Sequence, residues 1–412
     1  MNRLYTILFL LLFALPASAQ TTGPEVTNWI VNRTEAMGYG GLPSNVQAVQ
    51  YSSANVYVTC TCIPGYDIGP WAGNPNVPKN QNFLFQITRT PTVNTGTKTA
   101  TPLGHVGVWT NGVSIFNAKD ARSYNNAGVW NQNAIVVEGS SFDACIGHPA
   151  PNGEYHHHLN PVCLYDDKDS THHSPIIGYA FDGFPIYGAY GFAKTDGTGG
   201  IRRMNSSYRM RAITDRTTLP DGTALSSSQD GPALSTQYPL GYYIEDFEYI
   251  AGLGDLDQYN GRFCVTPEYP AGTYAYFVTI DSARTATYPY TVGPSYYGVV
   301  TAGDTGPGSG HVTISESVLT YAPSSGSVGE AADSSLFSLY PNPATDYVTV
   351  SYASTNDYLS HIVIRDVRGS LVLAKDMTSP GLVLPLVDIP EGSYFVTIFT
   401  TSGKKLTKRF VR

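Results

Sequence analysis

Charged residues are scarce in this sequence. Asp, Glu, Lys and Arg make up 14% of its 412 residues, against about 25% in an average soluble domain. Acidic residues outnumber basic ones, 32 to 24, so the formal net charge is −8. A protein that binds nucleic acid through the phosphates needs a basic excess, which this chain lacks. Nucleic-acid binding is therefore excluded.

Long hydrophobic runs and common catalytic motifs are also missing. Beyond the N-terminal segment, no apolar stretch approaches the roughly 20 residues that cross a membrane. The sequence holds no Gly-x-Ser-x-Gly elbow, no His-Glu-x-x-His pair and no phosphate-binding loop, so motifs point to no reaction. What is present is 30 Tyr, 41 Gly and 28 Pro in a chain that is 42% hydrophobic. This composition predicts a turn-rich, all-β protein with a real core.

The N-terminal segment is typical of a secretory signal peptide. Arg3 supplies the positive charge, an apolar stretch follows over residues 4–15, and Ala17 and Ala19 are small residues at a cleavage site. The apolar stretch is too short to anchor the chain in a bilayer. We expect residues 1–19 to be removed and the mature, exported protein to begin at Gln20.

Export permits disulfides, and the chain has five cysteines. Cys145 and Cys163 flank much of a histidine-rich stretch and are the preferred pair. Cys60 and Cys62 are too close to bridge comfortably, so we expect one of them to pair with Cys264. An odd number leaves at least one cysteine without a partner inside the chain.

Composition changes near residue 300, where a stretch rich in Gly, Ser and Thr begins. We therefore predict a main β domain over 20–300, a linker over 301–335 and a second domain over 336–412. Short alternating strands are predicted in that last segment, and their spacing is typical of a small immunoglobulin-like β-sandwich. The predicted strands are 347–352, 361–365, 371–374 and 394–400.

Particular stretches of this last segment resemble a known family. Residues 339–346 (Leu-Tyr-Pro-Asn-Pro-Ala-Thr-Asp), the turn at 389–394 and the basic terminal strand resemble the type IX secretion sorting domain of Bacteroidetes. The resemblance implies a cargo tail that partners the type IX secretion machinery and is usually removed after crossing the outer membrane. The protein is then secreted or held at the outer-membrane surface. An adhesive immunoglobulin-like module is the alternative.

The main domain contains an internal similarity. Residues 107–118 resemble residues 178–189, and each stretch has an Asn-Gly or Asp-Gly pair between apolar strands. Such pairs favour tight hairpin turns, so we predict two similar hairpins in a large irregular β domain. Two unrelated hairpins with common turn residues are the alternative. Residues 132–143 are predicted to form a strand and then a turn.

The histidines carry most of the chemical information. Nine are present, and seven of them lie between His105 and His173. In an extended segment, His156 and His158 face the same side, about 6.6 Å apart along the strand, whereas His157 faces the other side. Imidazoles with this spacing can bind one metal ion, so we predict a metal site that uses His156 and His158 but not His157.

The third ligand has to come from elsewhere in the chain. His173 is preferred because it opens the segment that leads into the second hairpin, and His148 is the next choice. Asp182, in the turn of that hairpin, is a further candidate. Imidazoles with a possible carboxylate suit copper or zinc, and the scarcity of Met disfavours a blue-copper site. The alternative is a set of structural histidines.

The same region resembles the YHYH family. The resemblance extends over most of residues 60–300. Four stretches carry it, namely 147–149, 155–158, 161–164 and 173–188. The family is named for a Tyr-His-Tyr-His core, and this chain has His157 in place of the second tyrosine. The family is defined by sequence, so the resemblance implies no reaction.

Three functions of different classes follow. The first is a secreted or cell-surface metal-binding protein with copper or zinc in the histidine cluster. The second is a secreted metal-dependent hydrolase, in which the metal activates water and Asp182 acts as base. The third is a surface module that binds a carbohydrate or protein through tyrosines, with structural histidines. The tyrosines considered for that role are Tyr274, Tyr276, Tyr288, Tyr290, Tyr296 and Tyr297.

Overall fold

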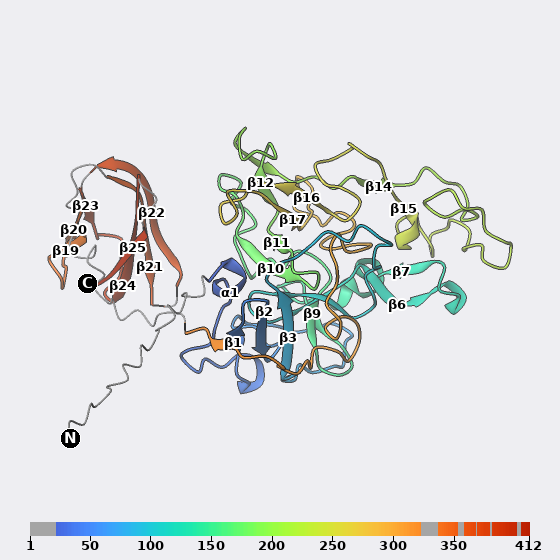
Figure 1. Cartoon of the computed structure of the whole chain (residues 1–412), viewed down its shortest axis with the longest axis horizontal. Helices are drawn as coiled ribbons and strands as arrows, with labels where there is room; N and C mark the ends of the chain where they lie inside the picture. Colours follow the sequence, from blue (N-terminus) through green and yellow to red (C-terminus); the bar gives the residue numbers. More distant parts are fainter. Residues whose placement is uncertain (1–21, 323–336, 353–357, 368, 380, 402–404) are drawn as a thin grey trace, which may run out of the picture. The chain divides into compact units, whose positions relative to one another are not determined.

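The computed structural model describes residues 22–322, 337–352, 358–367, 369–379, 381–401 and 405–412 (Figure 1). The predicted signal peptide and residues 323–335 of the predicted linker lie outside these ranges. The chain divides into two compact units, 1–321 and 322–412. Residues 301–321, predicted as linker, belong to the first unit. Among the described residues no helix has the length and apolar character to cross a membrane.

The fold is all-β, as predicted, and its first unit is built on two main sheets. The smaller sheet has the strand order β18-β1-β2-β3. Its strands are β1 (Val46–Tyr51), β2 (Asn55–Cys60), β3 (Phe83–Thr88) and β18 (Leu319–Thr320). Apolar side chains alternate along β3, where Phe83, Phe85 and Ile87 are buried. One face of this sheet therefore supplies part of the core.

The larger sheet has eight strands in the order β16-β17-β11-β10-β4-β5-β9-β8. Its first four strands in the chain are β4 (His105–Trp109), β5 (Ser114–Phe116), β8 (His148–Pro149) and β9 (Tyr155–His157). The others are β10 (Ile176–Ala180), β11 (Pro185–Tyr187), β16 (Gly261–Cys264) and β17 (Thr273–Phe277). The two predicted hairpins, β4–β5 and β10–β11, lie side by side at its centre because β4 pairs with β10.

The two halves of this sheet repeat one arrangement. The outer strand of each hairpin pairs in parallel with a further strand, β5 with β9 and β11 with β17. Each of those strands then pairs antiparallel with the strand before it in the chain, β9 with β8 and β17 with β16. The internal similarity therefore extends from the hairpins to both halves of the sheet.

Side chains alternate between two hydrophobic clusters, one on each face of the larger sheet. Val108 and Tyr179 belong to the cluster shared with the smaller sheet. Their neighbours Trp109 and Ala180 belong to the cluster on the opposite face. Both faces are covered, so the central strands are buried along their whole length.

Short elements surround these sheets, and long loops extend beyond β14 and β15 (Figure 1). Three two-stranded ribbons are β6 (Lys119–Ser123) with β7 (Asn131–Asn133), β12 (Tyr190–Phe192) with β13 (Ile201–Arg203), and β14 (Tyr208–Met210) with β15 (Phe247–Tyr249). The helical turns are α1 (Pro24–Thr27), η1 (Tyr39–Gly41), η2 (Tyr124–Asn126), α2 (Ala134–Glu138), η3 (Gly139–Ser141) and η4 (Ile244–Asp246).

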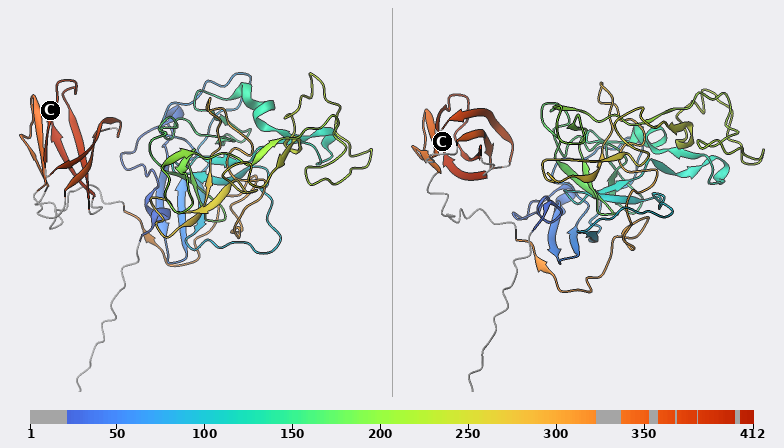
Figure 2. Two further views of the ribbon diagram at one scale, coloured as in Figure 1. Left: turned by 90° about the horizontal axis from the view of Figure 1, so that it is seen from above. Right: turned by 45° about the horizontal axis from the view of Figure 1, so that its top comes forward.

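The second unit is a small β-sandwich, as predicted (Figure 2). One layer has the order β19-β20-β23 and the other β22-β21-β24-β25. The strands are β19 (Phe337–Tyr340), β20 (Tyr347–Tyr352), β21 (Leu359–Asp366), β22 (Leu371–Ser379), β23 (Gly381–Pro385), β24 (Ser393–Thr400) and β25 (Lys405–Val411). Buried residues from both layers, such as Val350 and Ile398, form one apolar cluster between them.

Candidate metal centre

Three of the predicted histidines meet at one end of the larger sheet. His148 in β8 and His156 in β9 are directly opposite each other in the antiparallel pair. His158 follows β9 and lies two residues beyond His156, so its side chain returns to the same face. All three are buried. The prediction that His156 and His158 face one side agrees with this geometry.

A carboxylate completes the cluster. Glu138 ends α2, a short helix that begins after Asn133, whose side chain accepts a hydrogen bond from the Ile135 amide. Its Oε2 lies 3.0 Å from His158 Nε2 and 3.5 Å from His148 Nε2. His156 Nε2 lies 3.0 Å from His148 Nε2 and 3.2 Å from His158 Nε2. One ligand atom from each of the four residues lies within 4.8 Å of the others.

The second ring nitrogen of each histidine is held by an oxygen. His156 Nδ1 lies 3.1 Å from the Glu154 carbonyl oxygen, and His158 Nδ1 lies 2.6 Å from the Asn117 carbonyl oxygen. A carbonyl oxygen only accepts, so both Nδ1 atoms carry a proton. Each neutral ring then presents a lone pair at Nε2.

The proton of His148 also lies on Nδ1, where its partner is a serine hydroxyl. Its Nδ1 lies 2.7 Å from Ser141 Oγ, and that hydroxyl donates its own hydrogen to the Glu138 carbonyl oxygen at 2.8 Å. With the hydroxyl in this orientation His148 Nδ1 is the donor, which leaves a lone pair at its Nε2 as well. Three lone pairs and a carboxylate converge on one point, an arrangement that repels unless a cation lies among them.

Aromatic rings and burial isolate the cluster. The Phe116 ring stacks on His156 with centroids 3.8 Å apart, and the Phe142 ring packs edge-on against His148 at 4.9 Å. Burial, together with the neighbouring imidazoles, lowers the pKa of His156 well below its usual value. His156 is therefore neutral, as a metal ligand must be.

The pKa values of two neighbouring carboxyl groups, Glu138 and Asp120, are shifted in opposite directions. Burial opposes ionisation of Glu138, but the His148 and His158 rings beside its carboxyl group outweigh burial and hold the pKa of Glu138 well below its usual range. Asp120 lies beside Glu138, and its burial and this neighbour raise the pKa of Asp120. Glu138 is thus the ionised carboxylate next to the histidines. Its side chain is 29% exposed, so the cluster reaches solvent on the Glu138 side.

His157 faces away from the cluster, as expected for the residue between two ligands. It is buried next to Trp109 and Tyr155. Burial lowers its pKa to about 4. A disulfide joins Cys145 and Cys163, the preferred pair, and closes the segment that holds His148, His156 and His158.

Two predicted site residues lie elsewhere. His173, the preferred third ligand, packs against Tyr187 and Phe192 in the other half of the sheet, so that choice was wrong. Asp182 is fully buried, and its oxygens accept hydrogen bonds from the Tyr276 hydroxyl and from the Gly298 and Phe184 amides. These bonds hold the hairpin turn, so Asp182 is not positioned to act as the base.

The expected pairing of Cys264 with Cys60 or Cys62 was also wrong. All three are buried free thiols. Cys60 ends β2 in the smaller sheet, Cys264 ends β16 at the edge of the larger one, and the Cys62 thiol donates to the Tyr155 carbonyl oxygen at 3.0 Å. Burial raises the pKa of each thiol, which keeps it protonated.

The half of the larger sheet that contains β16 and β17 forms the same hydrogen-bonded frame as the half with β8 and β9, but without the histidines. The Tyr155 hydroxyl donates to Asp143, and in the same way the Tyr274 hydroxyl donates to Asp257. The amides of Gly147 and Gly261 donate to the same two aspartates. The two frames therefore correspond residue by residue.

This correspondence gives each ligand a counterpart. The pair His148–His156 matches the pair Arg262–Ala275, and His158 matches Phe277. In the second half the Arg262 guanidinium lies over the Phe277 ring, 5.6 Å from its centroid. The frame thus forms with an arginine, an alanine and a phenylalanine at these positions, so the histidines are not needed to build the sheet.

The fold and the sorting tail define the class of this protein, which is an all-β exported protein with a C-terminal β-sandwich. Residues 84–289 match the family model described as YHYH protein, and residues 338–412 match the secretion system C-terminal sorting domain. The chain therefore belongs to the YHYH protein family, as its motifs predicted. Its type IX sorting tail makes it a protein of the cell surface or the medium, handled by that secretion system.

Two solved structures have limited similarity to this chain. A DUF3244 family protein of Bacteroides vulgatus, with an immunoglobulin-like β-sandwich, is 21% identical and covers 19% of this chain and 83% of its own, with a TM-score of 0.17. PorZ of Porphyromonas gingivalis, a surface component of the type IX secretion system, is 13% identical and covers 92% of this chain and 53% of its own, also at 0.17. No curated protein matches.

Proposed function

We propose that this protein binds one copper or zinc ion through Glu138, His148, His156 and His158. The observation that carries the proposal is the convergence of three lone pairs and a carboxylate at one buried point. In a tetrahedral shell with bonds of about 2.0 Å, neighbouring ligand atoms are roughly 3.3 Å apart. Four of the six separations in the cluster are 3.0, 3.0, 3.2 and 3.5 Å, and all six are within 4.8 Å. The four ligand atoms are therefore close enough to bind one ion.

The second half of the sheet supports a chemical role for the histidines. Arg262 and Ala275 occupy the places of His148 and His156 there, and the strands pair in the same register. Buried imidazoles whose lone pairs face each other destabilise a fold unless a ligand compensates. Their presence in one half only is therefore explained by an ion.

The ligand set favours binding over hydrolysis. Catalytic zinc sites usually have three protein ligands and an open position for water, whereas closed sites have four. Four protein ligands converge here. Asp182, the predicted base, points into a hairpin turn instead. We therefore place metal binding ahead of the metal-dependent hydrolase.

Titration of the protein after removal of metal with a chelator tests the proposal. Zn²⁺ or Cu²⁺ added to the full chain should bind at one equivalent, measured by calorimetry. Glu138→Gln should weaken binding by at least 10-fold, because the neutral amide no longer balances the ion's charge. Glu248→Gln, which breaks an exposed pair with Arg209, is the matched control and should change nothing. Equal affinity in both variants would exclude Glu138 as a ligand.

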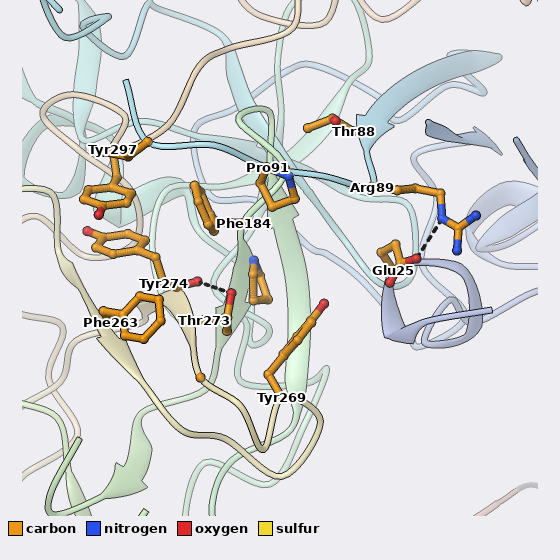
Figure 3. Close-up of a pocket in the computed structure, with 14 residues that line it drawn as sticks. Glu25, Thr88, Arg89, Pro91, Phe184, Phe263, Tyr269, Thr273, Tyr274 and Tyr297 are labelled. Atoms are coloured by element: carbon orange, nitrogen blue, oxygen red, sulfur yellow. Dashed lines mark hydrogen bonds and ion pairs between the residues drawn. The ribbon is translucent and has the colours of Figure 1, made fainter. Parts of the chain in front are cut away.

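A separate pocket supports carbohydrate binding as a second function. It has a volume of about 410 Å³ and lies around the β10–β11 turn and the β16–β17 hairpin (Figure 3). Tyr274 and Tyr297 stack at one side of it with centroids 3.6 Å apart, and Phe263 is 63% exposed nearby. Glu25 and Arg89 form an ion pair at the other side. Aromatic faces with charged groups suit the mixed surface of a sugar ring.

Most of the tyrosines considered for this role serve the core instead. Five of the six are buried, and only Tyr297 keeps partial exposure. Affinity electrophoresis against soluble xylan, pullulan and laminarin tests the pocket. Binding should be lost in Phe263→Ala, which removes an exposed ring without opening the core, and kept in Val299→Ala, an exposed control outside the pocket. Migration unchanged by every polysaccharide would reject this second function.

A further inference from the structure

A second polar cluster adjoins the candidate metal ligands, because Glu154, whose carbonyl oxygen contacts His156 Nδ1, belongs to it. His105 begins β4, and its Nδ1 lies 3.0 Å from Glu154 Oε1. Its Nε2 lies 2.8 Å from Ser309 Oγ. A carboxylate, an imidazole and a serine hydroxyl are thus hydrogen-bonded in series, through opposite nitrogens of one ring. We infer that Ser309, His105 and Glu154 form a serine-hydrolase centre that acts on carboxylic esters.

The geometry assigns each group a role. The Glu154 carboxyl oxygen accepts the proton of His105 Nδ1, which leaves Nε2 to accept the proton of the serine hydroxyl. Glu154 is a positioning residue, because it acts only through the ring. Asn152 holds the other Glu154 oxygen, with its Nδ2 3.4 Å away. The carboxylate and the ring are both buried, which strengthens their interaction.

The ring of His105 has little freedom to turn. Four phenylalanine rings lie edge-on around it, with centroids 5.4–6.5 Å away: Phe83, Phe85, Phe116 and Phe181. His105 and Glu154 both belong to the larger sheet or its immediate end. A base on a rigid element, held by packing, keeps the alignment that proton transfer needs.

Ser309 is the member of the cluster that a substrate can reach. It lies on a loop whose Gly303, Gly306, Gly308 and Gly310 all have positive φ. Ser309 is half-buried, whereas Pro307 and Gly308 beside it are exposed. Gly308 brings no side chain to the exposed side of the serine, whereas Gly310 on the other side packs against Phe83 and Phe85. Ser309 Oγ also lies 2.7 Å from the Gly306 carbonyl oxygen, and rotation of the hydroxyl turns its proton to His105.

The reaction follows in two balanced steps. Ser309 Oγ attacks the ester carbonyl carbon while its proton passes to His105 Nε2. The bond to the leaving alcohol breaks, and the alkoxide takes that proton, which leaves an acyl-serine. Water then attacks the acyl carbon, gives one proton to His105 and releases the carboxylic acid. The proton on His105 returns to Ser309 Oγ.

A fluorophosphonate probe tests this inference on the full mature chain, with EDTA present so that no bound metal contributes. The probe should form a covalent adduct on Ser309, located by peptide mass spectrometry. Ser309→Ala should abolish that adduct, and Ser206→Ala should keep it, because the Ser206 hydroxyl donates to the Tyr288 carbonyl oxygen and has no histidine partner. His105→Gln should slow labelling at least about 100-fold, because the general base is lost.

The variants at Glu154 separate positioning from mere packing. Glu154→Gln should slow labelling and Glu154→Asp should recover part of the rate, since only a carboxylate orients the ring. Turnover of p-nitrophenyl acetate should follow the same order. Absence of an adduct on Ser309 in protein with an unchanged melting temperature would overturn the inference. So would equal labelling rates in wild type and His105→Gln. Because EDTA is present, neither result bears on the metal proposal.

Discussion

At the residue scale, the candidate metal centre depends on where each imidazole keeps its proton. Two backbone carbonyls and the Ser141 hydroxyl hold the three Nδ1 atoms, so the Nε2 atoms are the ones that face inward. Partners of this kind orient metal-binding histidines and are costly to remove. The proposal therefore predicts that groups outside the ligand set, such as the Ser141 hydroxyl, also affect metal affinity.

Ser141→Ala tests one such group. Without the hydroxyl, His148 loses the acceptor that fixes its proton on Nδ1. Zinc affinity should fall by about 10- to 100-fold, the usual effect of losing such a partner. Ser140→Ala is the matched control, because Ser140 is the exposed neighbour in the same turn. Calorimetric titration of both variants checks this, and equal affinities would contradict the assigned tautomer of His148.

Asp304 gives a prediction about pH. It is fully buried, and its two oxygens accept the Gln86 amide at 3.2 Å. Burial raises the pKa of Asp304 to about 7, so between pH 4 and 7 the folded state holds this proton more tightly than the unfolded state. Its contribution to stability is therefore lost as pH rises through that window and is constant above it. Asp304→Asn keeps an oxygen for Gln86 and cannot ionise.

The expected result is a pH-dependent difference between the two proteins. Near pH 4 they should be equally stable, and at pH 8 the variant should be more stable by up to about 4 kcal/mol, for a shift of roughly three pKa units. Denaturant unfolding followed by tryptophan fluorescence reports on the first unit alone, because all four tryptophans lie in it. They are Trp29, Trp71, Trp109 and Trp130. The same stability difference at both pH values would refute this account of Asp304.

The sequence reveals local geometry at the site but not which distant groups meet. The alternation of His156, His157 and His158 follows from the period of a strand, so it could be predicted. Glu138 could not, because its segment contains Ile-Val-Val and resembles a strand, whereas it forms a short helix. Asn133, which caps that helix, was the available signal.

At the element scale, the repeated hairpin organises the first unit. Its two copies could be predicted because the turn signal is local: Gly112 and Gly183 take positive φ in corresponding turns. Which half His173 would join was not predictable, because proximity to a hairpin in sequence does not say which sheet edge a segment reaches. Parallel pairing of β9 with β5 depends on such long-range contacts.

The disulfide acts on the segment that holds the three histidines. Cys145 and Cys163 are 18 residues apart in sequence, and closing a loop of that size removes unfolded-state entropy equivalent to about 3 kcal/mol. Replacing both cysteines by serine should lower the stability of the first unit by about that amount and reduce zinc affinity. Tryptophan-monitored unfolding and calorimetry measure the two effects. Unchanged stability, or two free thiols in the secreted protein, would contradict this prediction.

At the scale of the whole molecule, the two units have separate tasks. Each has its own hydrophobic core, and the sorting tail contributes none of the candidate ligands. Deleting residues 336–412 should therefore leave the first unit folded but retained in the periplasm. Cell fractionation of the truncated and full-length proteins measures this. Surface delivery of the truncated protein would refute the role of the tail.

Metal content of the full-length mature protein, as purified from culture medium, tests the central claim most directly. Elemental analysis should find one copper or zinc per chain in wild type and in His157→Ala, whose side chain faces away from the cluster. His156→Ala should contain almost none, because its Nε2 lies between those of His148 and His158. Equal metal content in His156→Ala and His157→Ala, or none in wild type, would contradict the account.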